Sequence, residues 1–342
     1  MTLGRERYPI RRVTKYNMKV AAYVGDKVMD LSPAHICQLF YVLSAAAVLA
    51  VAAVPHTAQQ LLTRYGARSS RNTSASTSSE GRKESGRELD DNDLGPLFRL
   101  ISCLTSVGQI PHSWFIHFYI LSLSCTIFWA IQFVMNGTVL ELIVKSQLAR
   151  CTSSMTMGQV VLVWVLMGLQ GARRLYEYLA VLQPSSSSMW IIHWLLGNGF
   201  YLCTSVSIWV EGSRAIQCSG QSCSDVEFPP LKSVIASFVF LIAWFMQYRC
   251  HRYLAGLRKY SLPNEGLFRY LVCPHYTCEC LIYLSMAVLA APEGQFYNRT
   301  LACACLFVSV NLGLTANGTK IWYGEKFGKK IQGKWKMIPI VF

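Results

Sequence analysis

Seven blocks of apolar residues, each close in length to a membrane-spanning helix, constrain this chain more than any other feature of its sequence. They cover residues 36–54, 114–135, 160–182, 189–210, 231–247, 271–291 and 300–316. A helix needs about 20 apolar residues to cross the hydrocarbon core of a bilayer. Charged residues make up only 15% of the chain, whereas a soluble domain contains about a quarter. The sequence therefore predicts an all-α, polytopic membrane helix bundle of about seven transmembrane helices.

The polar segments between these blocks divide the chain into four parts. Residues 1–33 are polar and basic, and no apolar core follows them closely enough to form a cleaved signal peptide. Residues 34–55 contain the first span. Residues 56–96 form a polar loop in which the stretch 69–79 is nearly all Ser, Thr, Ala and Asn, a composition typical of disorder. Residues 97–342 then form one membrane domain.

Basic residues between and after the apolar blocks predict the orientation of the chain. The net charge is +14, which in a soluble protein would favour a nucleic-acid partner. Here the charge lies in segments such as 249–269 and 320–342, where topology and anionic headgroups explain it, so we expect no nucleic-acid partner. The positive-inside rule places both segments, and thus the C-terminus, in the cytosol. It places the acidic loop 211–227 and the sequon at Asn298 in the lumen.

The N-terminal segment does not follow the same rule. Seven spans and a cytosolic C-terminus put the N-terminus in the lumen and the loop 56–96 in the cytosol. The basic residues of segment 1–33 then lie on the wrong side of the membrane. Either the number of spans differs by one, or the late helices dominate the orientation.

The 13 cysteines do not indicate a metal centre. Most lie inside apolar blocks, where a thiol usually fills the core. One group of metal-ligand residue types lies near the start of the sixth block: Cys273, His275, Cys278 and Cys280. No second ligand pair with zinc-finger spacing accompanies it, so we expect no metal. Cys218 and Cys223 lie in the predicted lumenal loop, where an oxidising compartment permits a disulfide, although their spacing alone is weak evidence.

Charged residues inside the third block are a strong indication of function, because charges are costly within a membrane. Three- and four-residue offsets place four polar residues on one helical face: Gln170, Arg173, Arg174 and Glu177. The alternative is an interfacial arginine pair that reaches the cytosolic headgroups, with Glu177 as its counterion.

A second polar site opens the sixth block. His275 and Glu279 are one helical turn apart and therefore lie on one face. The structural alternative is a His–Glu pair that holds two helices together. The chain has no Gly-x-Gly-x-x-Gly and no Walker loop, so a dinucleotide would bind without a Rossmann domain. The basic loop 249–269 and the lysine-rich tail supply charge for its phosphates.

Several short motifs, taken in their order and spacing, resemble one known family. They are 111–119, 173–177, 247–251, 257–259, 274–276, Glu279, Trp322, Tyr323, Phe327 and 338–339. Together they are similar to the polyprenol reductase branch of the steroid 5α-reductase superfamily. Each motif alone is weak evidence, whereas their order and spacing are specific.

This resemblance implies an enzyme of the endoplasmic reticulum membrane that binds NADPH in a cleft open to the cytosol. It implies that 97–342 is the reductase domain and that 231–342 is its cofactor-binding part. Arg258 and Tyr260 would meet the phosphates. The other implied contacts are Gln247 and His251 on the adenosine side, His275 and Glu279 at the nicotinamide end, Tyr323 closing the pocket and Arg174 in its wall.

The resemblance does not identify the catalytic donor. Gly171 stands where steroid-reducing members have the tyrosine that polarises the carbonyl group of the substrate. A steroid substrate is therefore disfavoured, and another residue must take this role. The candidates are Tyr176, Glu177 and His117.

The chemistry of hydride transfer restricts the substrate. Hydride adds to a carbon–carbon double bond only where negative charge can spread to another atom, such as the oxygen of an α,β-unsaturated carbonyl. Combined with the resemblance, which implies a polyprenyl lipid, this chemistry leads us to expect the long-chain aldehyde polyprenal, reduced at its α-isoprene unit to dolichal on the route to dolichol and protein N-glycosylation. The alternatives are a very-long-chain enoyl-CoA reductase, a membrane isoprenylcysteine or phospholipid methyltransferase, and a non-catalytic lipid-binding membrane protein.

Overall fold

The computed structural model describes residues 31–53, 103, 107–151, 154–182, 187–219, 231–258 and 261–342. Four predictions fall wholly or mainly outside these residues. They concern the N-terminal segment 1–33, the serine-rich loop 56–96, the cysteine pair that includes Cys223, and Tyr260.

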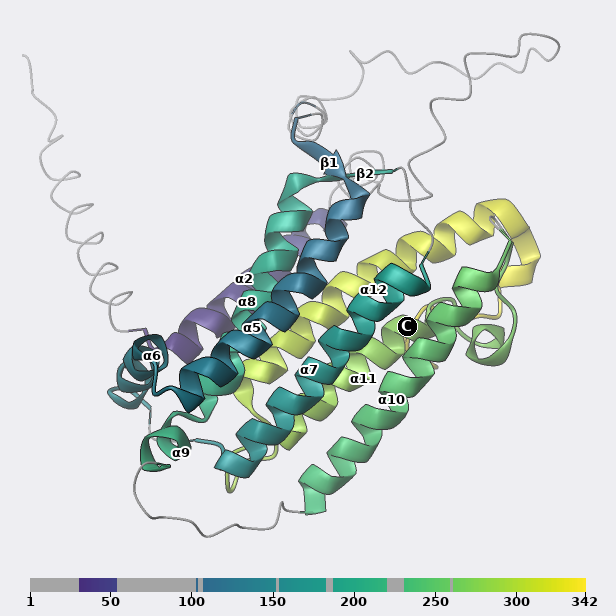
Figure 1. Ribbon diagram of the computed structural model, residues 1–342. Helices are drawn as coiled ribbons and strands as arrows, with labels where there is room; N and C mark the ends of the chain where they lie inside the picture. The colour runs from purple at the N-terminus through teal and green to yellow at the C-terminus, as the bar shows by residue number, and fades with distance from the viewer. Residues whose placement is uncertain are drawn as a thin grey trace, which may run out of the picture.

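Long helices dominate the described part of the chain (Figure 1). They are α2 (Pro33–Ala53), α5 (Ile116–Val134), α7 (Met157–Ala180), α8 (Ile191–Glu211), α10 (Leu231–Gly256), α11 (Pro274–Leu289) and α12 (Arg299–Phe327). Shorter helices are α6 (Thr138–Leu148), α9 (Ser213–Cys218), η2 (His112–Phe115), η3 (Gly266–Arg269) and η4 (Gly328–Ile331). The strands β1 (Gln109–Pro111) and β2 (Ser188–Trp190) form one short antiparallel pair.

Each of the seven predicted blocks coincides with one long helix, and the all-α prediction is confirmed. Five helical segments of the described part are long and apolar enough to cross a membrane: Pro33–Ala53, His112–Val134, Ile191–Glu211, Leu231–Gly256 and Arg299–Ile331. The other two long helices are α7, whose second half is rich in polar residues, and α11, which has only 16 residues. The predicted count of seven spans is therefore not confirmed, although all seven helices are present.

Hydrogen bonds between helix ends show that consecutive long helices alternate in direction. At one end of the bundle, Gln159 at the start of α7 donates to the carbonyl of Leu289 at the end of α11 (2.8 Å). Thr300 at the start of α12 donates to Glu211 at the end of α8 (2.5 Å). Lys232 at the start of α10 reaches the loop between α11 and α12 at the same end.

At the opposite end, β1 pairs with β2 directly before α5 and α8 begin (Figure 1). Tyr178, near the end of α7, donates to the carbonyl of Ser113 just before α5 (2.8 Å). Because α10 starts at the first end, the described residues of loop 257–273 that follow it, 257–258 and 261–273, lie at this second end. The residues that follow α12 lie here as well.

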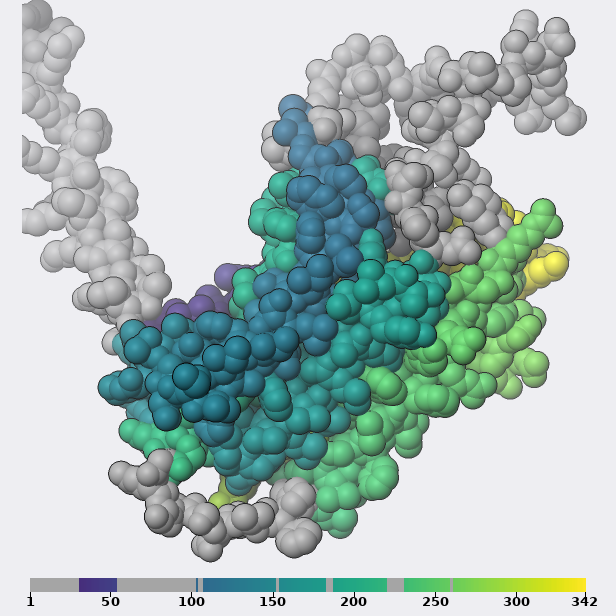
Figure 2. Space-filling view, viewed as in Figure 1, coloured from purple at the N-terminus to yellow at the C-terminus, as the bar shows by residue number. Residues whose placement is uncertain are grey.

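Apolar side chains both fill the interior of the bundle and cover its outside. Tyr41, Phe240 and Met286 are fully buried. The outer faces of the same helices expose large apolar side chains such as Phe238 and Ile242. Figure 2 shows this outer surface on one side, formed by α5, α7 and α10. Exposed apolar faces of this extent are expected where helices contact lipid. These faces and the several long apolar helices indicate a multi-pass membrane protein.

The asparagine of the sequon is an internal helix cap. Asn298 is fully buried, and its side-chain oxygen accepts from the backbone N–H of Leu301 (3.0 Å) at the start of α12. Its side-chain amide donates to the carbonyl of Ala290 (3.3 Å), just after α11. The side chain therefore ties the turn between the two helices.

Candidate active site

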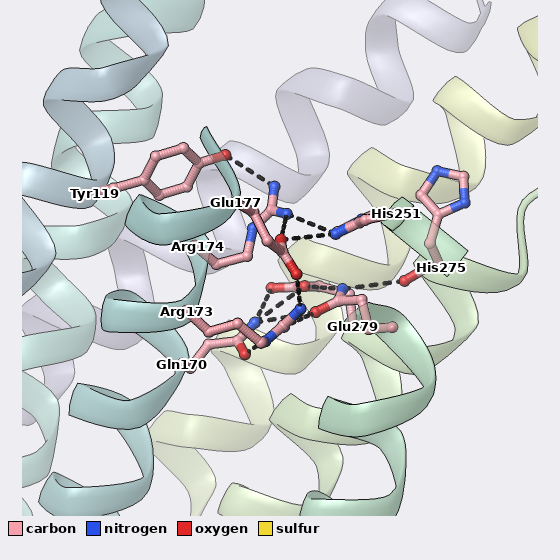
Figure 3. Close-up of polar contacts among 9 residues, drawn as sticks. Tyr119, Gln170, Arg173, Arg174, Glu177, His251, His275 and Glu279 are labelled. Carbon is pink, nitrogen blue, oxygen red and sulfur yellow. Dashed lines mark hydrogen bonds and ion pairs between the residues drawn. The ribbon is translucent and has the colours of Figure 1, made fainter. Parts of the chain in front are cut away.

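Polar side chains from four helices meet in the interior of the bundle (Figure 3). Tyr119 comes from α5, Gln170, Arg173, Arg174 and Glu177 from α7, Gln247 and His251 from α10, and His275 and Glu279 from α11. We call these nine residues the polar cluster. It lies in the second half of α7 and α10 and in the first turns of α11, towards the end of the bundle that carries loop 257–273.

Glu177 is the centre of charge in the polar cluster. Its side chain is 0% exposed and forms ion pairs with Arg173 and, at 2.5 Å, with Arg174. His251 contacts the same carboxylate through Nδ1 at 2.8 Å. A buried carboxylate is strongly unfavourable unless it is paired and hydrogen-bonded. Glu177 and the two arginines therefore depend on one another inside the bundle.

A layer of amides connects these charges to Glu279. Arg173 donates to the side-chain oxygens of Gln170 (2.7 Å) and Gln247. The amide nitrogens of Gln170 and Gln247 in turn donate to the carboxylate of Glu279. Glu279 is only partly buried as a residue, and both amides hold its carboxylate.

Two buried nitrogen atoms of the polar cluster have no hydrogen-bond partner within the described residues. They are Nδ1 of His275 and Nε of Arg173. His275 joins the cluster through its backbone carbonyl, which accepts from Gln247 (3.1 Å), while its ring points away (Figure 3). A buried polar atom without a partner is unfavourable by about 1–3 kcal/mol, so the ring nitrogen of His275 is suited to a ligand.

The C-terminal residues 328–342, which we call the tail, pair with the segment that leads into α11. The backbone N–H of Trp335 donates to Tyr270 (2.9 Å), and the carbonyl of Trp335 accepts from Val272 (2.8 Å). The hydroxyl of Thr277, in the first turn of α11, donates to the carbonyl of Met337 (2.6 Å). The tail therefore holds the start of α11, from which His275 and Glu279 project.

Lys334 fastens the loop between α10 and α11 to this tail. Its side chain is almost completely buried, and its ammonium group donates to Pro263 O (2.9 Å), Asn264 Oδ1 (3.0 Å) and Phe268 O (2.8 Å). These three bonds use all three hydrogens of the ammonium group. Burial lowers the pKa of Lys334, and the three oxygens replace the water that the charge has lost.

We expect Lys334→Met to destabilise the protein by about 1–3 kcal/mol, because it leaves buried oxygens of loop 263–268 without a donor. Lys330→Met is the matched control, since Lys330 lies in the same tail and is exposed. Thermal unfolding in a mild detergent measures the difference. Equal unfolding temperatures for the two variants would show that the Lys334 bonds do not hold the loop.

Six of the predicted site residues meet in the polar cluster: Arg174, Glu177, Gln247, His251, His275 and Glu279. Tyr323 does not belong to it. Its ring lies 5.8 Å from that of Phe327, and it packs on a small core formed by the tail and the start of α11. Arg258 is exposed directly after α10.

The three candidate catalytic residues do not come together. Glu177 is buried between the two arginines. Tyr176 is 54% exposed on another face of α7. His117 accepts from the indole N–H of Trp194 (3.2 Å) near the β1–β2 end of the bundle and lies beside the ring of Trp114.

Tyr119, the last residue of the motif 111–119, is not among the predicted site residues, yet the structure brings it into the polar cluster. Its hydroxyl accepts from Arg174 (2.8 Å), and the Arg174 guanidinium lies 5.1 Å from its ring centre. A tyrosine within an apolar block is common in membrane helices, so the residue type gave no signal. Only the packing of α5 on α7 reveals the contact.

Within the described residues, no group of three or more His, Cys, Asp or Glu side chains is placed to hold a metal ion. A small cavity of about 10 Å³ lies between α5, α7 and α8. Its lining includes Ser122, Tyr201 and Ser205. It has room for one group the size of a water molecule.

Comparisons with known proteins give consistent results. The profile of the family described as 3-oxo-5-alpha-steroid 4-dehydrogenase matches residues 221–342. The chain is 27% identical to "Polyprenal reductase" of Caenorhabditis elegans over 277 residues, which cover 71% of this chain and 88% of the worm protein. It is 34% identical to "Polyprenal reductase" of Saccharomyces cerevisiae over 181 residues, covering 53% of this chain and 64% of the yeast protein. It is 27% identical to "Polyprenal reductase 2" of Oryza sativa subsp. japonica, covering 68% of this chain and 79% of the rice protein.

Proposed function

We propose that this chain is a member of the steroid 5α-reductase family, whose profile matches residues 221–342, and that it is an oxidoreductase that reduces the α-isoprene double bond of polyprenal. The observation that carries this proposal is the similarity to polyprenal reductases along most of the chain, above all to the worm protein over 88% of its length. Three relatives from animal, fungal and plant species share this description.

The proposed reaction adds two hydrogens across the double bond next to the aldehyde. Hydride adds to the β-carbon, and the electron pair of the double bond moves towards the carbonyl oxygen to form an enolate. A proton then reaches the α-carbon, and the product is dolichal. A donor that stabilises the negative oxygen is the main contribution that a protein can make to such a step. Dolichol, and through it protein N-glycosylation, is the proposed destination of the product.

NADPH is the proposed cofactor, and it supplies the hydride when bound. The residues fit such a group in two respects: Nδ1 of His275 is buried without a partner among the described residues, and Glu279 is only partly buried. We propose that these two residues hold the nicotinamide end. The other proposed contacts are Gln247, His251 and Arg174 in the polar cluster, Arg258 and Tyr260 at the phosphates, and Tyr323 near the tail.

We propose that the protein lies in the endoplasmic reticulum membrane, with its C-terminus and the cofactor site at the cytosolic face. The alternating helices support this arrangement, because they bring loop 257–273 and the tail 328–342 to the same end of the bundle. Both segments are rich in Lys and Arg, as the positive-inside rule requires of cytosolic segments.

The test uses microsomes from cells that overproduce the protein and from matched cells that do not. They receive NADPH with polyprenal or, in parallel, with polyprenol, and the saturated products are measured by mass spectrometry. We expect dolichal from polyprenal only in the overproducing sample, and much less with NADH. No product from either lipid, with the protein present, would contradict the proposal. Enoyl-CoA substrates and labelled S-adenosylmethionine then test the two enzymatic alternatives.

A further inference from the structure

Helices α5 and α7 run in opposite directions with a specific register at the polar cluster. A Cβ atom placed on Gly171 of α7 would lie 2.9 Å from the hydroxyl oxygen of Ser122 on α5. A larger residue at position 171 would therefore force the side chain of Ser122 to shift. Three residues before Ser122 on α5 is Tyr119, and three residues after Gly171 on α7 is Arg174. The close approach at glycine thus brings Tyr119 onto Arg174, at 2.8 Å.

The hydroxyl proton of Tyr119 is available to form a hydrogen bond with another partner. Arg174 can only donate, so the oxygen of Tyr119 is the acceptor in their hydrogen bond. Among the described residues, no acceptor lies within hydrogen-bond distance of the Tyr119 proton. The residue is nevertheless only 5% exposed. Tyr119 is therefore a buried O–H donor whose oxygen is already held in place.

Other tyrosines near the polar cluster differ from Tyr119. The hydroxyl of Tyr178, whose ring lies 6.0 Å from that of Tyr119, donates to the backbone carbonyl of Ser113. Tyr176 faces outward. Within the described residues, Tyr119 is the only tyrosine whose hydroxyl is hydrogen-bonded to an arginine of the polar cluster.

Arg174 makes Tyr119 a suitable partner for an oxygen that becomes negative. A hydrogen bond to a developing oxyanion is strengthened by a nearby positive charge in a water-poor site. Arg174 supplies that charge, and Glu177 fixes its position through an ion pair at 2.5 Å. The guanidinium therefore needs no rearrangement when the charge appears on the substrate.

We propose that Tyr119 is a catalytic residue that donates a hydrogen bond to the carbonyl oxygen of the substrate and stabilises the enolate. This inference rests on the function proposed above. In the step, the β-carbon of the unsaturated aldehyde gains a hydride, which bound NADPH would supply as it is oxidised to NADP⁺. The π electrons move to the carbonyl oxygen, which Tyr119 holds. A proton from water then adds to the α-carbon and restores the carbonyl group.

The test compares Tyr119→Phe with the control Tyr178→Phe in the purified full-length protein. The two variants lose the same hydroxyl from neighbouring rings. With NADPH and polyprenal, we expect kcat to fall by about 10²–10³-fold in Tyr119→Phe, as for loss of one oxyanion donor, with little change in KM. We expect less than a threefold change in Tyr178→Phe. The dissociation constant for NADPH and the unfolding temperature should remain close to wild type in both variants.

A second readout does not depend on turnover. The short aldehyde geranial, labelled with carbon-13 at its carbonyl group, is bound to the protein without NADPH, and its carbonyl stretch is recorded by infrared difference spectroscopy. We expect wild type and Tyr178→Phe to lower the stretching frequency, and Tyr119→Phe to abolish this shift. The role of Tyr119 would be overturned if the wild type were active and Tyr119→Phe were equally active. It would also be overturned if the carbonyl band of the bound aldehyde were the same in Tyr119→Phe as in wild type. A wild type that reduces no polyprenal would instead contradict the proposed function itself.

Discussion

Glu177→Ala is expected to destabilise the protein by about 3–5 kcal/mol, the typical effect of breaking a buried ion pair from one side. The substitution leaves Arg173 and Arg174 inside the bundle without the carboxylate that pairs with both. It also removes the group that contacts Nδ1 of His251. The free energy of unfolding, measured by titration with SDS in mixed micelles, reports the change.

Glu141→Ala is the control for this measurement. Glu141 also pairs with a basic residue one turn away, Lys145, but their side chains are 56% and 69% exposed. An exposed pair of this kind contributes about 0–1 kcal/mol. If both variants lost the same small amount of stability, the polar cluster would not be held together by Glu177.

Glu279→Gln is expected to raise the dissociation constant for NADPH by about 10- to 150-fold. This corresponds to the loss of about 1.5–3 kcal/mol for one hydrogen bond to a charged group. The substitution keeps the shape of the side chain but places an NH₂ group where Gln170 and Gln247 both donate. The proposed cofactor contact and the amide layer are disturbed together. Quenching or enhancement of NADPH fluorescence in the purified protein gives the constant.

Glu293→Gln provides the comparison for cofactor binding. Glu293 is exposed in the turn between α11 and α12, at the end of α11 remote from the polar cluster. Its substitution removes the same charge from the protein, so a general electrostatic effect on NADPH would appear in both variants. Unchanged binding in Glu279→Gln would exclude this carboxylate from the cofactor site.

The sequence predicted the helices well because their apolar blocks are set by length and composition alone. The polar face of α7 was also predictable, since the offsets between Gln170, Arg173 and Glu177 define one side of a helix. The short helices α6 and α9 were not predicted. They lie at the end of the bundle, where neither block length nor periodicity gives a clear signal.

The composition of the candidate site was only partly predictable. Helical periodicity shows which face of α11 carries His275 and Glu279, but it does not show which helix covers that face. Tyr119 and Lys334 therefore escaped prediction as partners, since their contacts join residues far apart in the sequence. Tyr176 follows Arg174 by two residues and so points to another face, although sequence proximity made it a candidate.

The three hydrogen bonds from Lys334 to loop 263–268 also determine when the candidate site is completed during synthesis. Lys334 lies 71 residues after Pro263, whose carbonyl it binds, and it follows the last long helix. A nascent chain that has reached Phe327 has therefore inserted every long helix of the bundle but leaves loop 263–268 unfastened. Because chains emerge from the N-terminal end, a premature stop between Phe327 and Lys334 should give a protein that enters the membrane yet never matures. The defect that cellular quality control would then act on lies in loop 263–268, outside the helices.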